Sequence, residues 1–424
     1  MATVSRRLPR SPSLEIPERE AAELLAEVRA GLASALARVE SCRTRAGKDA
    51  LAFPAPQEFQ AEHTQFVLAR EYGFADWREM ADRIRLDGPA SFLEVAIRAD
   101  DRETALRLIR EHPLLLELPL RSGNWGPPLS HAANLGRLEL IREFAARGAK
   151  DVQHAFDRAI LQGQIECARW LLAHGGRLEP GIVMGACETL DQAGLSFLSE
   201  VNAPFTDHHG NQLAPLGLIL ETYSRDPDGK HGSLEVMRRR GYEFPDTAIM
   251  AFHRGDVPRL AEHLREDPAL LERRFTTREI YPPELGCGSE GKSGMCGTPL
   301  EGSTFLHLAI DFDEVEIFRW LLEQGADVNA RTTVDEQGFG GHTPLFNAVV
   351  SCAFLCGRQK DARMTRQLLE RGAAQDARAN LRKFLDWIDN PRWHEARAVT
   401  PLEWGRGFPE ANWANPEVMR LLGE

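Results

Sequence analysis

Apolar side chains recur at helical spacing in two short runs within residues 302–331. The runs are separated by a polar break at 311–314, and they predict two helices carried by Leu306, Ala309 and Ile310 and by Val315, Ile317, Phe318, Leu321 and Leu322. We expect Gly325 to end the second helix, because the residue just past a helix end often adopts a left-handed conformation. Each short helix buries only one face against the other. The stretch therefore predicts a unit that needs neighbours on both sides.

The same stretch resembles an ankyrin repeat. The family pattern T-P-L-H-x-A is matched in part at residues 306–309, with Phe305 where proline is usual, and L-L-x-x-G-A-D-V-N-A is matched almost without change at 321–330. The resemblance implies an all-α fold, an ankyrin-repeat solenoid of helix-turn-helix repeats with short β-turn fingers. It also implies that His307 hydrogen-bonds neighbouring backbone and links repeats. The other residues expected to have structural roles in the repeats are Gly325, Thr343, Pro344 and Gly372.

Weaker copies of this pattern occur on both sides. Residues 88–275 predict degenerate repeats, of which 92–120 and 246–275 share a variant ending, EHPLLL at 111–116 and EDPALL at 266–271. We expect about nine units in all, including one that begins with the GHTPLFNA sequence at 341–348. Residues 1–17 predict a mobile N-terminus, and 18–87 predict a small helical domain that caps the first repeat and ends near Leu86. Its sequence LAREYGFADWREMADRI is similar to a segment that precedes the repeats in many bacterial ankyrin proteins.

Repeat spacing becomes uneven in the last part of the chain, residues 276–424. Extra sequence occurs at 276–301, 332–340 and 379–399, in the positions where the family has its projecting β-turn fingers. Insertions at one register of successive repeats emerge on one face, which is often the binding face. We therefore expect three long fingers side by side over the concave groove.

The residue types of these fingers favour a binding site. Aromatic side chains and arginine commonly anchor recognition. An alternative is that the aromatic residues only pack the long loops onto the scaffold. The candidate ligand-binding residues are Tyr281, Glu284, Arg331, Phe339, His342, Asn347, Trp387, Trp393 and Trp404.

Charge and hydropathy narrow the classes of partner. The chain has 51 Lys and Arg against 63 Asp and Glu, a formal net charge of −12. This excess of acid argues against nucleic acids and anionic membranes, because binding to phosphates relies on Lys and Arg. No run of about 18 apolar residues predicts a membrane span, and no apolar stretch follows the basic residues at the start of the sequence. We therefore expect a cytoplasmic protein, and the seven scattered cysteines are expected to be reduced thiols.

The sequence contains no complete motif for catalysis, cofactor binding or metal binding. No Walker loop, HExxH, nucleophile elbow or dinucleotide fingerprint is present, and the GKS at 291–293 lacks the strand and helix that a phosphate loop needs. Cys287 and Cys296 are separated by eight residues, which is not the usual spacing of a zinc site, and Cys352 and Cys356 lie four apart on a presumed helix. The acids at 311, 313 and 314 could bind a cation, but a solvated helix start is the simpler interpretation. We predict neither a cofactor nor a metal.

Two functions follow from these observations. The leading prediction is a cytoplasmic ankyrin-repeat binding module that recognises a protein or peptide in the concave groove under the long fingers. The alternative is a small-molecule-binding protein or an enzyme, with a pocket formed by the C-terminal fingers and the adjacent first helices. A closed pocket with converging His, Glu and Tyr side chains would favour the alternative, and an open groove with dispersed aromatics would favour the binding module.

Overall fold

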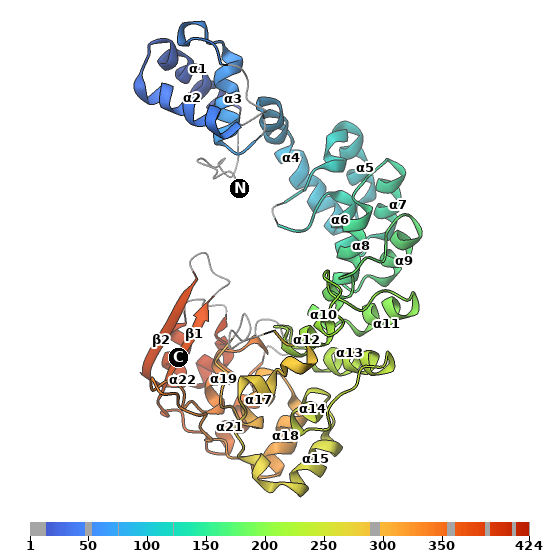
Figure 1. Cartoon of the computed structure of the whole chain (residues 1–424), viewed down its shortest axis with the longest axis vertical. Helices are drawn as coiled ribbons and strands as arrows, with labels where there is room; N and C mark the ends of the chain where they lie inside the picture. The colour runs from blue at the N-terminus through green and yellow to red at the C-terminus, as the bar shows by residue number, and fades with distance from the viewer. Residues whose placement is uncertain are drawn as a thin grey trace. The chain divides into compact units, whose positions relative to one another are not determined.

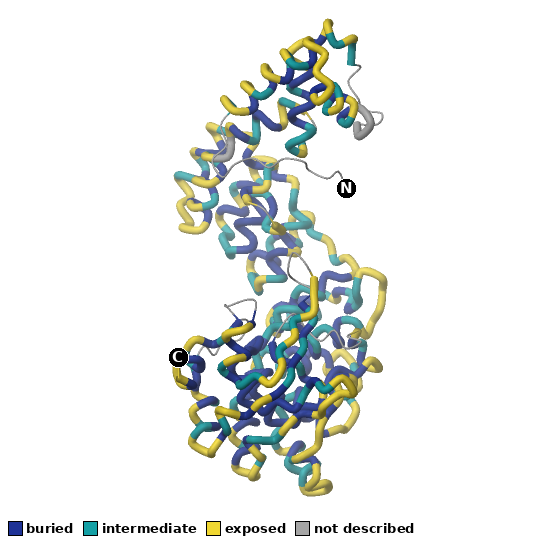
Figure 2. Tube along the Cα trace, turned by 90° about the vertical axis from the view of Figure 1, so that its left-hand side faces the viewer, coloured by how far each residue is buried: buried dark blue, intermediate teal, exposed yellow. Residues whose placement is uncertain are grey.

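The computed structural model describes residues 14–46, 53–74, 76–121, 123–288, 297–353, 361–385, 391–408 and 413–423. The chain divides into two compact units, Met1–Ala155 and Phe156–Glu424, which are described separately. The elements are labelled in Figure 1. Buried residues run through the interior of each unit, as Figure 2 shows. None of the helices in the described ranges is long and apolar enough to cross a membrane.

The first unit begins with a three-helix cluster. It consists of α1 (Glu15–Arg29), α2 (Ala33–Ala46) and α3 (Ala61–Glu71), with a short 3-10 turn, η2 (Pro56–Glu58), before α3. Leu24 and Val28 of α1 pack with Val67 and Leu68 of α3, and all four are buried. Most of this cluster lies within residues 18–87, whose extent as a separate small domain stays a prediction. Its role as a cap stays a prediction.

The next helix, α4 (Trp77–Ala99), is longer than predicted. It starts at Asp76, whose carboxylate accepts a hydrogen bond from the Glu79 N–H at 2.8 Å. The predicted end near Leu86 is wrong, because the helix continues through Pro89. Proline removes one helical hydrogen bond. Buried side chains continue the apolar stripe beyond it, so packing favours the longer helix; they are Leu93, Ala96 and Ile97.

Short antiparallel helices follow in pairs. The rest of the first unit contains α5 (Arg102–Glu111), η3 (Pro113–Glu117), α6 (Pro128–Asn134) and α7 (Leu138–Ala146), and the division between the units falls within α8 (Val152–Leu161). The second unit continues with α9 (Ile165–Ala173), α10 (Met184–Glu188), α11 (Gln192–Glu200), α12 (Ala214–Glu221), α13 (Pro227–Arg239), α14 (Ala248–His253), α15 (Val257–Glu266) and η4 (Pro268–Leu271). Its last part contains α16 (Thr277–Ile280), η5 (Pro283–Leu285), α17 (Phe305–Asp311), α18 (Val315–Glu323), α19 (Pro344–Val349), α21 (Arg363–Glu370), α22 (Pro401–Gly407) and α23 (Pro416–Leu421).

The helices α17 and α18 form the helix-turn-helix unit predicted from residues 302–331. They pack on each other, and α17 also packs on α19, which in turn packs on α22, so the first helices of successive units stand next to one another. Gly325 follows α18 with φ of 86°, in the left-handed conformation that lets a helix end. Gly372 has the same role after α21, with φ of 85°. These two helix ends are confirmed.

A β-hairpin stands between α21 and α22. It pairs β1 (Ala379–Leu385) antiparallel with β2 (Arg392–Val399), and these are the only strands of the described residues that form a sheet. Burial alternates along β1, with residues 379, 381, 383 and 385 buried. The inner face of the hairpin packs toward α22, where the Trp404 ring stacks on His394 with centroids 5.2 Å apart. The sequence predicted a finger at 379–399 but not its strands.

The acids of the 311–314 turn are buried, so their interpretation as a solvated helix start is wrong. Asp311 forms an ion pair with Arg225 at 2.9 Å, and both side chains are at most 5% exposed. Glu314 contacts the His231 ring at 2.9 Å. No group of three or more potential metal ligands is found among the described residues. The acids therefore connect this repeat to the helix that begins just after Arg225.

Lys230 on α13 is also buried beside this turn. Its ammonium donates to Nδ1 of His253 at 2.7 Å, and Nε2 of that ring donates to the Ile280 carbonyl at 2.7 Å. Lys230 also lies over the Phe312 ring, 4.1 Å from its centroid. Burial, together with the nearby Arg225 charge, lowers the pKa of Lys230 to about 7 against the opposing effect of nearby acids.

The cysteines differ in state. Cys42, Cys167, Cys187 and Cys287 are buried and form no disulfide. Cys352 is disulfide-bonded, so the expectation of a reduced thiol is wrong at this position. Burial raises the pKa of the Cys167 thiol to about 11, which makes it a poor nucleophile at neutral pH.

A Lys230→Met variant should change how stability depends on pH. The unfolded chain takes up a proton at this amine below the ordinary lysine pKa of 10.5, but the folded chain does so only below about 7. Between these values the unfolded state binds more protons, so this lysine makes the wild type gain stability as pH rises, by at most about 1.4 kcal/mol per pH unit. Urea unfolding at pH 7 and pH 9.5 should show a smaller gain in the variant. Equal gains would contradict the assignment, and Lys150→Met, at an exposed lysine, is the control.

Candidate binding site

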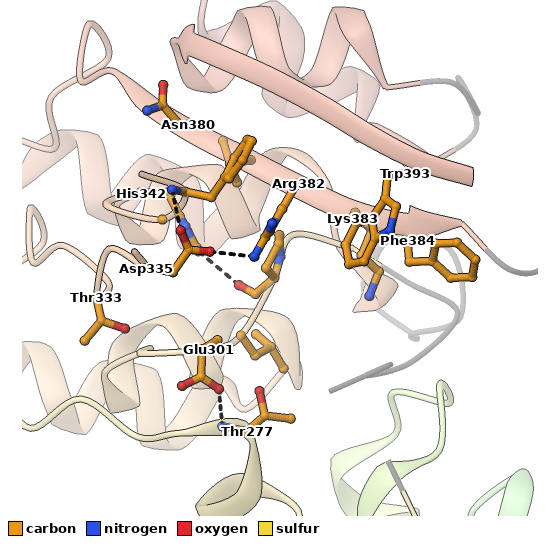
Figure 3. Close-up of a pocket in the computed structure, with 15 residues that line it drawn as sticks. Thr277, Glu301, Thr333, Asp335, His342, Asn380, Arg382, Lys383, Phe384 and Trp393 are labelled. Atoms are coloured by element: carbon orange, nitrogen blue, oxygen red, sulfur yellow. Dashed lines mark hydrogen bonds and ion pairs between the residues drawn. The ribbon is translucent and has the colours of Figure 1, made fainter. Parts of the chain in front are cut away.

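A cavity of about 520 Å³ lies where the three long fingers meet, within the second unit. Its lining residues come from each finger and from the start of the repeat at 341 (Figure 3). The first finger supplies Thr277, Pro299, Leu300 and Glu301; the second supplies Thr333, Asp335, Phe339 and Gly340, followed by His342; the third supplies residues 380–384 of β1 and Trp393 of β2. The structure thus brings together the three insertions that the sequence placed at one register.

The second finger is a tight turn organised by Asp335. Its carboxylate accepts hydrogen bonds from the N–H groups of Gln337 and Phe339, each at 2.9 Å, and its own N–H donates to the Phe339 carbonyl at 2.8 Å. Partial burial raises the pKa of this carboxyl, but these bonds and Arg382 outweigh it and hold the pKa below its usual value. Asp335 is therefore ionised at neutral pH.

Gly340 attaches this finger to the hairpin. Its N–H donates to the Asn380 carbonyl at 2.7 Å, on the edge of β1 that does not face β2. Its φ is 114°, and a Cβ there would lie 2.0 Å from the Thr333 carbonyl oxygen. Both the conformation and the close approach of two backbones require glycine.

Aromatic rings and arginines form one wall of the cavity. Arg382 pairs with Asp335 at 2.9 Å, and its guanidinium lies 4.9 Å from the Phe339 ring centroid and 5.5 Å from that of Trp393. The rings of Phe384 and Trp393 are 5.4 Å apart across the two strands. Trp393 is 57% exposed, so this wall opens to solvent. The guanidinium of Arg382 is therefore held in place by an ion pair and by two aromatic rings.

His342 belongs to the buried base of the cavity. Its Nε2 donates to the Pro299 carbonyl at 3.0 Å, and its Nδ1 accepts from the Thr332 hydroxyl at 3.1 Å. Burial lowers the pKa of the ring to about 4, so the imidazole is neutral at pH 7. The His342 carbonyl accepts from Nε2 of His307 at 3.2 Å, and Nδ1 of His307 lies 2.9 Å from the Thr304 hydroxyl. Both histidines therefore hold backbone segments in place.

The opposite wall is the end of the first finger. Glu301 accepts a hydrogen bond from the Thr277 N–H at 2.7 Å, which fixes residues 299–301 against the start of α16. Figure 3 shows Glu301 and Thr277 across the cavity from the hairpin. The two walls are thus an acidic loop end and a cationic, aromatic strand.

Two predicted residues of the first finger lie elsewhere. Tyr281 is buried, with its ring 6.5 Å from His253 and 6.2 Å from Phe312, and burial raises its pKa. Glu284 is exposed on η5. The segment around them packs against α12, where the Cys287 thiol contacts the Gly217 carbonyl. This part of the finger fits the loop-packing alternative.

Other predicted residues stabilise the scaffold around the cavity. Arg331 donates to the carbonyls of Gly341 and Arg378, at 2.7 and 2.9 Å, and so connects the second finger to the start of the third. Trp404 is fully buried and donates from Nε1 to the Thr298 hydroxyl at 3.0 Å. Asn347 is fully buried, and its side-chain amide has no hydrogen-bond partner among the described residues.

The cavity therefore collects three of the predicted ligand-binding residues, Phe339, His342 and Trp393. Trp387 lies outside the described residues. Thr343 and Pro344 occupy the N-cap and the first turn of α19. The lining residues that were not among the candidate ligand-binding residues are Thr277, Pro299, Leu300, Glu301, Thr333, Asp335, Gly340, Asn380, Leu381, Phe384, Arg382 and Lys383. The two-residue alternation of apolar side chains at 379, 381 and 385 was the available signal for the strand that carries the last two.

Residues 301–333 match the family model described as Ankyrin repeat. Two solved structures that resemble the chain are the ankyrin repeat domain of human ASB11 and the Bd0816 predatory endopeptidase of Bdellovibrio bacteriovorus in complex with the immunity protein Bd3460. The first has 18% identity and a TM-score of 0.25 and covers 72% of this chain and 99% of that chain. The second has 11% identity and a TM-score of 0.19 and covers 66% of this chain and 97% of that chain. No protein of curated function matches the sequence.

The family match and the paired helices together define an all-α ankyrin-repeat fold, as the sequence predicted. Ankyrin repeats are generally protein-interaction modules. The bacterial type of the protein stays a prediction.

Replacing Gly340 by Ala should loosen the second finger from the hairpin. The new methyl group would meet the Thr333 carbonyl and force an unfavourable φ, at a cost of about 1–3 kcal/mol. Gly338→Ala is the matched control, since its φ is 82° but no atom lies within 4 Å of the added carbon. Thermal unfolding and hydrogen exchange of the amide at 340 should show a larger effect for the Gly340 variant. Equal effects in the two variants would show that the close approach does not matter.

Proposed function

We propose that this protein is a protein-interaction module and that it recognises a peptide segment of a partner protein in the cavity between the three long fingers. The observation that carries the proposal is the exposed, pre-ordered wall of Trp393, Phe384 and Arg382. We further propose that this happens in the cytoplasm, as expected from the sequence.

The chemistry of this wall suits an anchor for a protein partner. Tryptophan and arginine are enriched among the residues that contribute most to protein-protein binding. Arg382 is already oriented by Asp335 and by two aromatic rings, so it loses little conformational freedom when a partner binds. An aromatic or aliphatic side chain of the partner could cover Trp393 and remove its exposed surface from water.

The polar groups of the cavity favour a binding module over an enzyme. His342 is neutral and uses both ring nitrogens to hold backbone and the Thr332 hydroxyl. Glu301 accepts from the Thr277 N–H. Tyr281 and Glu284, which the alternative function would place in the pocket, do not line it. The His, Glu and Tyr side chains that the alternative needs therefore do not converge in this cavity, and the small-molecule alternative gains no support there.

The proposal can be tested by selecting binders from a random library of 12-residue peptides and measuring their affinity by fluorescence anisotropy. Trp393→Ala should weaken the selected peptides by about 10- to 30-fold, as expected for an anchor worth roughly 2 kcal/mol. Phe92→Ala is the matched control, because Phe92 is 68% exposed but belongs to the first unit. Peptides that bind the Trp393 variant as well as the wild type would refute this site.

A further inference from the structure

We infer that the partner segment binds as an additional β-strand on the free edge of β1, and that it is an acidic segment. The inference rests on the proposed function and specifies how the same site would recognise its partner.

The edge of β1 that does not pair with β2 carries main-chain N–H and C=O groups. One edge of β1 is paired with β2 from Leu385 to Ala379. On the other edge, the only pairing among the described residues is the bond from the Gly340 N–H to the Asn380 carbonyl. Main-chain groups of alternate residues point to the same side of a strand. The N–H and C=O groups of Arg382 and Phe384 therefore point the same way as the Asn380 carbonyl.

The cavity runs along this edge. Its lining includes residues 380–384 on one side and Pro299, Leu300 and Glu301 on the other. A neighbouring strand needs about 4.8 Å between backbones. Gly340 of the second finger already pairs with Asn380, at the start of β1, where an added strand would also begin. Within the finger, Gly340 pairs in turn with Val334. A partner segment would continue the sheet from the point where the finger turns away.

Side chains of an added strand would alternate between two environments. One set would face the side of the hairpin that carries Arg382, Phe384 and Trp393, and the other would face the side of Leu381 and Lys383. The first environment suits an aromatic or aliphatic residue next to a carboxylate. The second is narrower, since Leu381 and Lys383 are buried. This alternation predicts a selectivity with a period of two residues.

The charge of the hairpin specifies the partner further. Its two strands carry four basic residues, Arg382, Lys383, Arg392 and Arg397, and a single acid, Glu395, in a chain whose net charge is −12. Arg397 lies over the Phe339 ring, 4.3 Å from the centroid, on the same face as Arg382. The cavity lining itself is balanced, with Arg382 and Lys383 against Asp335 and Glu301. The net positive charge of the hairpin, in a chain that is otherwise acidic, would attract an acidic segment to this edge.

The test uses the tightest peptide from the random 12-residue library. Methylation of one peptide N–H at a time removes a donor and blocks strand pairing. Affinity should therefore fall by about tenfold at every second position of the paired segment and change little at the positions between them.

The charge of the partner is tested with the same peptides. The selected peptides should be rich in Asp and Glu, and replacing these residues by Lys should weaken binding by at least about tenfold. Their affinity should also fall as the NaCl concentration rises from 50 to 300 mM.

A pair of protein variants gives an independent measurement. Phe384→Ala removes the ring. Phe384→Pro removes the ring and also the backbone N–H at the edge of β1, and an edge strand can accept proline because that N–H has no partner within the sheet. The proline variant should bind the peptide several-fold more weakly than the alanine variant, with both shown to be folded by circular dichroism. The peptide methylation scan does not depend on the folding of any variant.

The outcomes separate the two proposals. Weakening by Trp393→Ala without a two-residue period in the methylation scan would overturn strand addition and leave the proposed function standing. Selection of neutral or basic peptides would overturn the acidic partner. Selected peptides that bind the Trp393→Ala variant with the same affinity as the wild type would refute the proposed site. They would also refute the addition of a strand to β1.

Discussion

A chain of hydrogen bonds through two buried neutral imidazoles holds together the segments that surround the cavity between the fingers. It runs from Thr304 through His307 and the His342 backbone, and on through the His342 ring to Pro299. Hydrogen bonds to both ring nitrogens stabilise a buried imidazole, because an unpaired polar group away from water costs about 1–3 kcal/mol. Each ring does this by binding backbone or a threonine hydroxyl of another segment. Two repeats and the first finger are thereby fixed relative to one another.

The base of the cavity is thus built from segments that are distant in sequence, and the fingers add to it in different ways. The second finger is ordered by the Asp335 carboxylate and by Gly340. The third is a hairpin whose inner face rests on Trp404. The first divides its length between a packed part around Tyr281 and a wall at 299–301. The scaffold holds the fingers in place, and the face of the hairpin that carries Trp393 is exposed to solvent.

Local patterns were readable from the sequence, whereas long-range partners were not. The helices α17 and α18 follow from an apolar period within a few residues, and the helix ends at Gly325 and Gly372 follow from glycine's freedom at positive φ. The three insertions also indicated where the cavity lies. The burial of Asp311 and Glu314 was missed because their partners, Arg225 and His231, precede them by more than 80 residues. The strands at 379–399 were not predicted, because the polar Lys383 interrupts the apolar alternation of residues 379, 381 and 385 and the resemblance implied only a finger.

The free edge of β1 also bears on how the protein remains separate from its own copies. An open strand edge is a template on which another edge can assemble, and charged side chains along it are a common protection against aggregation. Arg382 and Lys383 stand on this edge, and the hairpin as a whole is basic. Two identical hairpins brought edge to edge would place these like charges against one another. The residues that would attract an acidic segment thus also discourage self-association through the same edge.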